Sequence, residues 1–94
     1  MSKAVHLANL QQQLRRHEER LAADEKRLAE GTPQERVEAA GDLAIVRQRV
    51  DATRQKIEHL EAAPDTAWEN LKAEIEQDLG FIESAFDRWL VRKG

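Results

Sequence analysis

The sequence predicts an all-α protein, an antiparallel up-down-up three-helix bundle with coiled-coil-like packing. Three observations support this prediction: many residues that favour helices, two short breaks near residues 32 and 64, and apolar residues spaced three or four apart between the breaks. The chain has 94 residues, of which 35% are charged and 4% are aromatic. We therefore expect a single domain, residues 1–94, with helices at about 2–30, 33–63 and 65–92.

The first break, Gly31-Thr32-Pro33, contains signals that end one helix and begin the next. Gly31 is expected to adopt the left-handed conformation that closes a helix. Thr32 is expected to cap the following helix, with Pro33 at its first position and Glu35 completing a capping box. These signals predict a sharp reversal of the chain.

The second break lies at Ala63-Pro64. Pro64 restricts the backbone of the residue before it and therefore ends the second helix. Asp65 or Thr66 is expected to cap the third helix, and Glu69 has the spacing of a second capping box with Thr66. Because both breaks are short, consecutive helices are expected to lie antiparallel.

Each segment carries one apolar stripe with the spacing of a coiled-coil seam. The stripes consist of Leu7, Leu10, Leu14, Leu21 and Leu28 in the first segment, of Leu43, Val46, Val50, Thr53, Ile57 and Leu60 in the second, and of Trp68, Leu71, Ile75, Leu79, Ile82, Phe86 and Trp89 in the third. The outline resembles a spectrin repeat in architecture. The segment 67–72, AWENLK, is similar to a stretch found in small bacterial coiled-coil proteins of unknown function.

Polar residues interrupt the seam at His17, Asp24 and Asp78. One interpretation places His17 and Asp24 at the rim of a narrow seam, where they reach water. The other is a buried polar layer, in which folding the chain symmetrically about the breaks puts Leu14–His17 level, to within about a turn, with residues 47–50 and 78–81. His17 would then pair with Asp78, and Asp24 would lie near Arg88. Since buried polar groups often fix register, His17→Leu is expected to keep or raise thermal stability while loosening register or oligomeric state.

Two glycines, Gly41 and Gly80, fall inside predicted helices, where each costs about 1 kcal/mol relative to alanine. Solvent-facing positions would tolerate them. For Gly80 the alternative is a close approach of a neighbouring helix or a local kink, since Leu79, Phe81 and Ile82 surround it with apolar side chains.

Composition argues against several classes of function. The chain has no Cys, which excludes disulfides and Cys-ligated zinc. With 15 basic and 18 acidic residues its net charge is −3, so no nucleic-acid partner is expected. The three histidines lack metal-ligand spacing, and no nucleophile motif or phosphate-binding loop is present. We expect no catalytic, metal or cofactor-binding residue and no enzymatic activity. The first residues lack a secretory signal, and a cytoplasmic location is expected.

Two apolar residues, Ile45 and Phe81, lie off the main stripes. They either widen the core face or mark a patch for a partner. The expected function is therefore a non-enzymatic interaction or scaffolding module that docks a helix of a protein partner or of a second copy. The alternative is a lipid-surface or granule-coat protein that uses the amphipathic third helix. The interaction candidates are Ile45, Trp68, Phe81, Phe86 and Trp89, of which Trp68 and Trp89 are favoured for the core.

Overall fold

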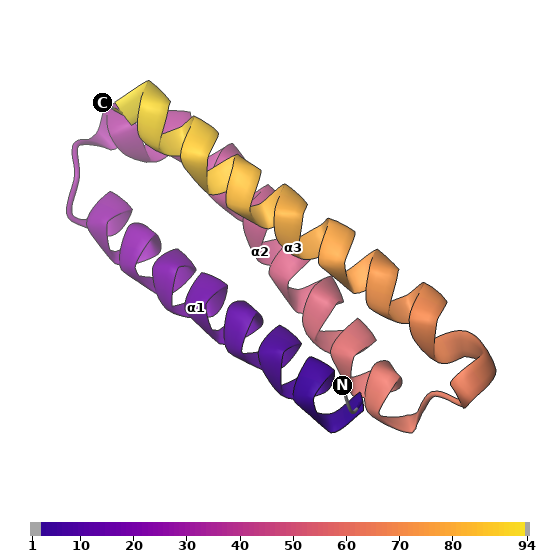
Figure 1. Cartoon of the computed structure of the whole chain (residues 1–94). Helices are drawn as coiled ribbons and strands as arrows, with labels where there is room; N and C mark the ends of the chain where they lie inside the picture. The colour runs from indigo at the N-terminus through magenta and orange to yellow at the C-terminus, as the bar shows by residue number, and fades with distance from the viewer. Residues whose placement is uncertain (1–2, 94) are drawn as a thin grey trace.

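The computed structural model describes residues 3–93, and of residues 38 and 89–93 it describes the backbone alone. Three helices run side by side: α1 (Lys3–Ala29), α2 (Pro33–Ala62) and α3 (Asp65–Lys93). Their directions alternate, which confirms the predicted up-down-up bundle (Figure 1). The result is a rod of 49 × 19 × 17 Å.

The first connection differs in one detail from the prediction. Thr32 Oγ1 accepts a hydrogen bond from the backbone N–H of Glu35 at 3.2 Å, which confirms the predicted cap. Gly31 does not have a positive φ, so the expected left-handed closure is wrong. Instead, Arg36 Nη1 donates to the carbonyl oxygens of Ala29 and Gly31, each at 3.2 Å. A side chain from α2 thus supplies the partners that the last carbonyls of a helix lack.

The second connection ends α2 as predicted. Ala63 has an extended backbone (φ −71°, ψ 140°) immediately before Pro64. However, α3 begins at Asp65, so the expectation that Asp65 or Thr66 caps it is wrong. Pro64 occupies the cap position, and its carbonyl oxygen accepts the N–H of Ala67 at 3.0 Å. Asp65 therefore lies in the first helical turn, where its negative charge complements the helix dipole.

The core follows the predicted apolar stripes. Trp68 and Phe86 are 4% and 1% exposed, so both are core residues, as favoured for Trp68. Thr53 is fully buried, and its hydroxyl donates to the carbonyl oxygen of Arg49 at 2.7 Å. Burial of each large apolar side chain contributes about 1.5–3 kcal/mol. The core cluster contains Leu10, Leu14, Leu21, Leu43, Val46, Val50, Ile57, Leu60, Trp68, Ile75, Leu79, Ile82 and Phe86.

Polar contacts at seven-residue intervals define the register of α1 relative to α2, that is, which residues of the two helices lie at the same level. Each step of seven residues up α1 matches seven residues down α2, as expected of charged positions flanking a coiled-coil seam. The pairs are Gln11 with Glu61 (2.8 Å), Glu18 with Arg54 (3.1 Å) and Glu25 with Arg47 (2.9 Å).

This level corrects the symmetric fold-back expected from the sequence. Because Glu18 contacts Arg54, the stretch 14–17 lies about two turns away from residues 47–50. The connection runs on past the end of α1 before α2 begins, so the chain does not reverse symmetrically (Figure 1). Loop length requires only the antiparallel direction, whereas the match of apolar and charged positions selects the offset.

Both helix-interior glycines face solvent. A Cβ built on Gly41 or on Gly80 meets no atom within 4 Å. The solvent-facing interpretation is therefore confirmed, and the close helix approach considered for Gly80 is wrong.

Replacing Gly80 with alanine is expected to stabilise the bundle by about 1 kcal/mol, because alanine removes backbone entropy from the unfolded chain without steric conflict. Urea denaturation followed by circular dichroism measures the change. Ile75→Ala is the control, since Ile75 is fully buried and its truncation should cost about 2–5 kcal/mol. A loss of stability in Gly80→Ala would contradict the open environment seen at this position.

Candidate functional site

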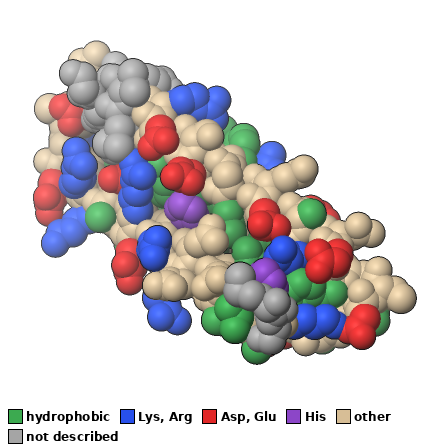
Figure 2. All heavy atoms as spheres, viewed as in Figure 1, with side chains coloured by type: hydrophobic (Ala, Val, Ile, Leu, Met, Phe, Trp, Pro, Cys, Tyr) green, Lys and Arg blue, Asp and Glu red, His purple; other side chains and the backbone are tan. Residues whose placement is uncertain are grey.

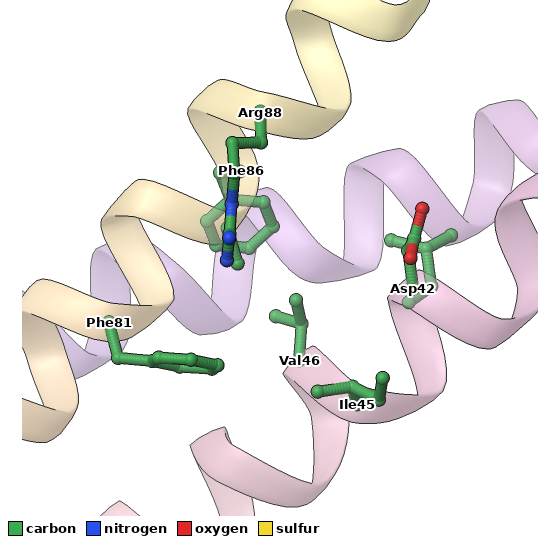
Figure 3. Close-up of a pocket in the computed structure, with 8 residues that line it drawn as sticks. Asp42, Ile45, Val46, Phe81, Phe86 and Arg88 are labelled. Carbon is green, nitrogen blue, oxygen red and sulfur yellow. The ribbon is translucent and has the colours of Figure 1, made fainter.

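An apolar hollow of about 260 Å³ opens between α2 and α3. Two large apolar side chains stand at its mouth, Ile45 at 51% and Phe81 at 36% exposed. Figure 3 shows Phe81 projecting from α3 toward Ile45 and Val46 of α2. The hollow is lined by Asp42, Leu43, Ile45, Val46, Phe81, Ala85, Phe86 and Arg88.

Charged side chains frame this hollow. The Arg49 guanidinium lies 4.5 Å from the centroid of the Phe81 ring, a cation–π contact that covers part of the exposed ring. Asp42 and Arg88 line the other end, one from each helix (Figure 3). The site therefore combines an apolar floor with a rim of both signs, the composition of a small protein-docking surface.

Asp78, on α3, is paired with Lys56 of α2. Lys56 Nζ is 2.7 Å from Asp78 Oδ2 and 2.8 Å from Glu74 Oε1. Hydrogen bonds to Asp78 and then to Glu74 raise the pKa of Lys56. The predicted pair of His17 with Asp78 is therefore not formed, because the register places a lysine of α2 next to this carboxylate.

His17 instead packs against Phe86. The ring centroids are 6.0 Å apart and the planes are inclined by 29°, while the guanidinium of Arg20 lies 4.5 Å from the Phe86 centroid. Desolvation by burial lowers the pKa of His17, and the negative charge of Glu83 partly opposes this. His17 thus serves as a half-buried cover for a core aromatic residue.

A polar side chain of α1 also covers an aromatic ring of α3 at the other end of the α1–α3 contact. His6 lies 5.9 Å from the Trp68 ring, and Lys3 Nζ lies 5.8 Å from it. Lys3 also forms an ion pair with Asp65 at the start of α3. Polar side chains of α1 therefore cover aromatic residues of α3, and the hollow along this side of the rod is polar as well.

The carboxylate of Asp24 is buried, and its polar atoms are only partly paired. Only 4% of the residue is exposed, and Oδ2 has no hydrogen-bond partner among the described residues. Oδ1 lies 3.8 Å from Arg27 Nη1. The rim interpretation is therefore wrong for Asp24, and so is its placement near Arg88, which lines the α2–α3 hollow instead. Desolvation raises the pKa of Asp24, and the charges of Arg20 and Arg27 oppose the rise.

The predicted interaction candidates divide into two groups. Ile45 and Phe81 meet at the hollow, whereas Trp68 and Phe86 belong to the core. Trp89 lies outside the residues whose side chains are described.

The charged rim was missed at the sequence level. The available signal was a seven-residue series on α2, Glu35, Asp42, Arg49 and Lys56, whose sign changes once from acidic to basic. Charge pairs four residues apart lie one turn apart on a helix, whereas residues seven apart lie on the same face two turns apart. A search for pairs at a spacing of four therefore does not find this series.

Elsewhere the surface mixes charges. Figure 2 shows acidic and basic side chains interspersed over the visible face, with apolar side chains in separate small patches. Among the residues whose side chains are described, no three His, Cys, Asp or Glu residues are grouped so that they could hold a metal ion. No helix in the described part of the chain combines the length and the apolar character needed to cross a membrane.

Comparison of the chain with protein-family models, with curated proteins and with solved structures gives no match.

Replacing Asp24 with leucine is expected to raise the free energy of unfolding at pH 7 by about 1–3 kcal/mol, because it removes a buried, incompletely partnered polar group. The gain should depend on pH. Since the pKa of Asp24 is raised in the folded state, the native protein binds this proton more tightly, and the wild-type penalty develops as pH rises above 3.8. Urea titrations at several pH values test this.

The matched control for Asp24→Leu is Asp87→Leu, which removes an exposed carboxylate from α3. It should change stability by less than about 0.5 kcal/mol at every pH. Equal gains for Asp24→Leu at pH 3 and pH 7 would show that the buried charge is not the cause.

Protonation of His17 is expected to oppose folding. Its pKa is lowered in the folded state, so stability should fall as pH drops below 6.5, and His17→Leu should remove this part of the dependence. Thermal melts between pH 5 and 8 measure the difference, with exposed His59→Leu as control. An identical pH dependence in wild type and His17→Leu would contradict the role assigned to burial.

Proposed function

We propose that this protein is a non-enzymatic interaction module that docks an α-helix in the groove between α2 and α3. The observation that carries the proposal is the pair Ile45 and Phe81, which remain exposed on opposite sides of an apolar hollow. Most large apolar side chains of the described residues are instead buried in one continuous core. Exposed apolar residues that converge on one hollow are typical of a docking surface.

The dimensions favour a protein partner over a small molecule. A hollow of about 260 Å³ is smaller than the roughly 300–1,000 Å³ of small-molecule pockets. It accommodates an apolar side chain of a helix lying along the groove. The antiparallel helices α2 and α3 lie side by side, and the groove between them has the shape that receives such a helix.

The rim specifies the chemistry of the partner. Arg49 and Arg88 favour acidic side chains, and Asp42 favours a basic one. The expected ligand is therefore an amphipathic helix that presents an apolar residue to the hollow and charges of both signs beside it. Charges at the rim of an interface contribute mainly to specificity and association rate.

The lipid alternative has less support. The apolar stripe of α3, including Trp68, Ile75 and Phe86, is buried against the other helices. A lipid surface would reach this stripe only if the bundle opened.

Site-specific photo-crosslinking tests the proposal in cells that make the protein. A photoreactive amino acid in place of Ile45 should give a discrete protein adduct, because the partner helix covers this position. The same group in place of Glu19, which is exposed on α1, is the matched control and should give none. Adding Phe81→Glu should abolish the adduct at position 45 without unfolding the bundle.

Three results would overturn this function: no adduct from position 45, equal adducts from positions 45 and 19, or adducts with lipid alone. The last would support the lipid-surface alternative. Circular dichroism melts confirm that each variant is folded before its crosslinking is interpreted.

A further inference from the structure

The charges of α2 form a pattern that is complementary to itself. Glu35, Asp42, Arg49 and Lys56 are seven residues apart and therefore share one side of α2. Arg49 and Lys56 of this series contact α3. Two acidic residues precede two basic ones. Such a series is matched by its own copy when the copy runs in the opposite direction.

Building on the proposed docking function, we infer that the partner at the groove is a second copy of this chain, whose own α2–α3 face packs on it. In the inferred dimer, the α2–α3 faces of two copies pack antiparallel around a twofold axis. The axis runs across the interface and passes over α2 at the level of Ile45 and Val46. The α2 helices of the two copies therefore face each other, and so do the α3 helices. Isologous interfaces of this kind are the commonest in homo-oligomers.

The position of the axis follows from the charges. Asp42 and Arg49 are each three and a half positions from the point between residues 45 and 46. Rotation about that point places Asp42 of one copy level with Arg49 of the other, and the symmetry forms this pair twice. Glu35 and Lys56 are each ten and a half positions away, so they are also brought to the same level, although Lys56 is already paired with Asp78 and Glu74 in its own chain.

The same axis gives α3 a complementary arrangement. Phe81 lies level with Arg49, so the axis crosses α3 near Ser84 and Ala85. Phe81 and Arg88 then lie at equal distances on either side, and Phe81 of one copy comes level with Arg88 of the other. A guanidinium over this ring adds a second cation–π contact to the one made by Arg49.

The apolar part of the groove fits the same occupant. Ile45 lies almost on the axis, so the two Ile45 side chains meet at the centre of the interface, flanked by the two Phe81 rings. The groove face runs along a rod 49 Å long and 19 Å wide. The area of such a face is comparable with the roughly 800 Å² that each partner contributes to a standard interface.

A charge-reversal experiment tests this arrangement. Sedimentation equilibrium or light scattering of the wild-type protein should give twice the mass of one 10.8 kDa chain at sufficient concentration. Asp42→Arg places two arginines opposite each other at both symmetry-related pairs, and Arg49→Asp does the same with two aspartates. Each variant alone should dimerise at least about tenfold more weakly than the wild type.

An equimolar mixture of Asp42→Arg and Arg49→Asp should restore association. The arginine introduced at position 42 of the first variant then faces the aspartate introduced at position 49 of the second. The unchanged Arg49 of the first variant faces the unchanged Asp42 of the second. A parallel pairing of the two faces would instead leave the introduced arginine facing Arg88 of the other chain. Recovery of a heterodimer therefore supports the antiparallel arrangement, and failure of two folded variants to associate overturns it.

Matched controls are available on α1, which does not line the groove. Glu19→Arg and Arg15→Asp make the same charge changes at exposed positions and should leave the wild-type affinity unchanged. If either charge reversal in the groove unfolds the bundle, the neutral variants Asp42→Asn and Arg49→Gln replace the pair. Each neutral variant should then dimerise more weakly than the wild type, and their mixture should recover part of the lost affinity, because the mixed dimer keeps one Asp42–Arg49 pair.

The outcome separates this inference from the proposed function. A wild-type protein that stays monomeric while position 45 crosslinks to a different protein would overturn the second copy but retain the helix-docking function. A monomer without any adduct at position 45 would overturn both.

Discussion

The seven-residue register between α1 and α2 determines how the rest of the molecule is arranged. Apolar and charged positions recur with the same period on both helices, so a single offset satisfies the core and the three flanking contacts together. A slip by one turn would separate these polar pairs and misalign the leucines. The connection at residues 30–32 adapts to this offset, with Arg36 replacing the expected glycine closure.

The register also explains the polar character of the α1–α3 contact. Once α1 is aligned on α2, its second seam position presents His17 and Asp24 toward α3 rather than leucines. His17 is accommodated because an imidazole can cover the Phe86 ring, whereas Asp24 has no equivalent partner. Burial then shifts the two pKa values in opposite directions, each toward the neutral form. The bundle is therefore held mainly through α2, which packs closely on both neighbours.

Local features were predictable from the sequence, and relations between helices were less so. Thr32, Pro33 and Pro64 locate the helix boundaries through steric and hydrogen-bonding effects confined to a few residues. The apolar stripes likewise identify Trp68 as core, whereas Phe86, which lies on the same stripe, was expected to contact a partner and is also buried in the core. The partner of Asp78 and the burial of Asp24 depend instead on the offset between helices, which the lengths of the breaks do not determine. The assumption that the chain reverses symmetrically predicted a pair of His17 with Asp78. In the actual offset, Asp78 pairs with Lys56.

The α2–α3 hollow has two large apolar side chains at its mouth that lie outside the core. Ile45 and Phe81 project beside the core rather than into it, so the alternative that they simply widen the core face does not fit their exposure of 51% and 36%. Arg49 covers part of the Phe81 ring, which reduces its contact with water while leaving the hollow open. A cation over an aromatic face is easily kept when a second surface approaches from the side, since the interaction needs no defined hydrogen-bond direction. The arrangement thus protects an apolar residue in the isolated rod and leaves it available for contact with another helix.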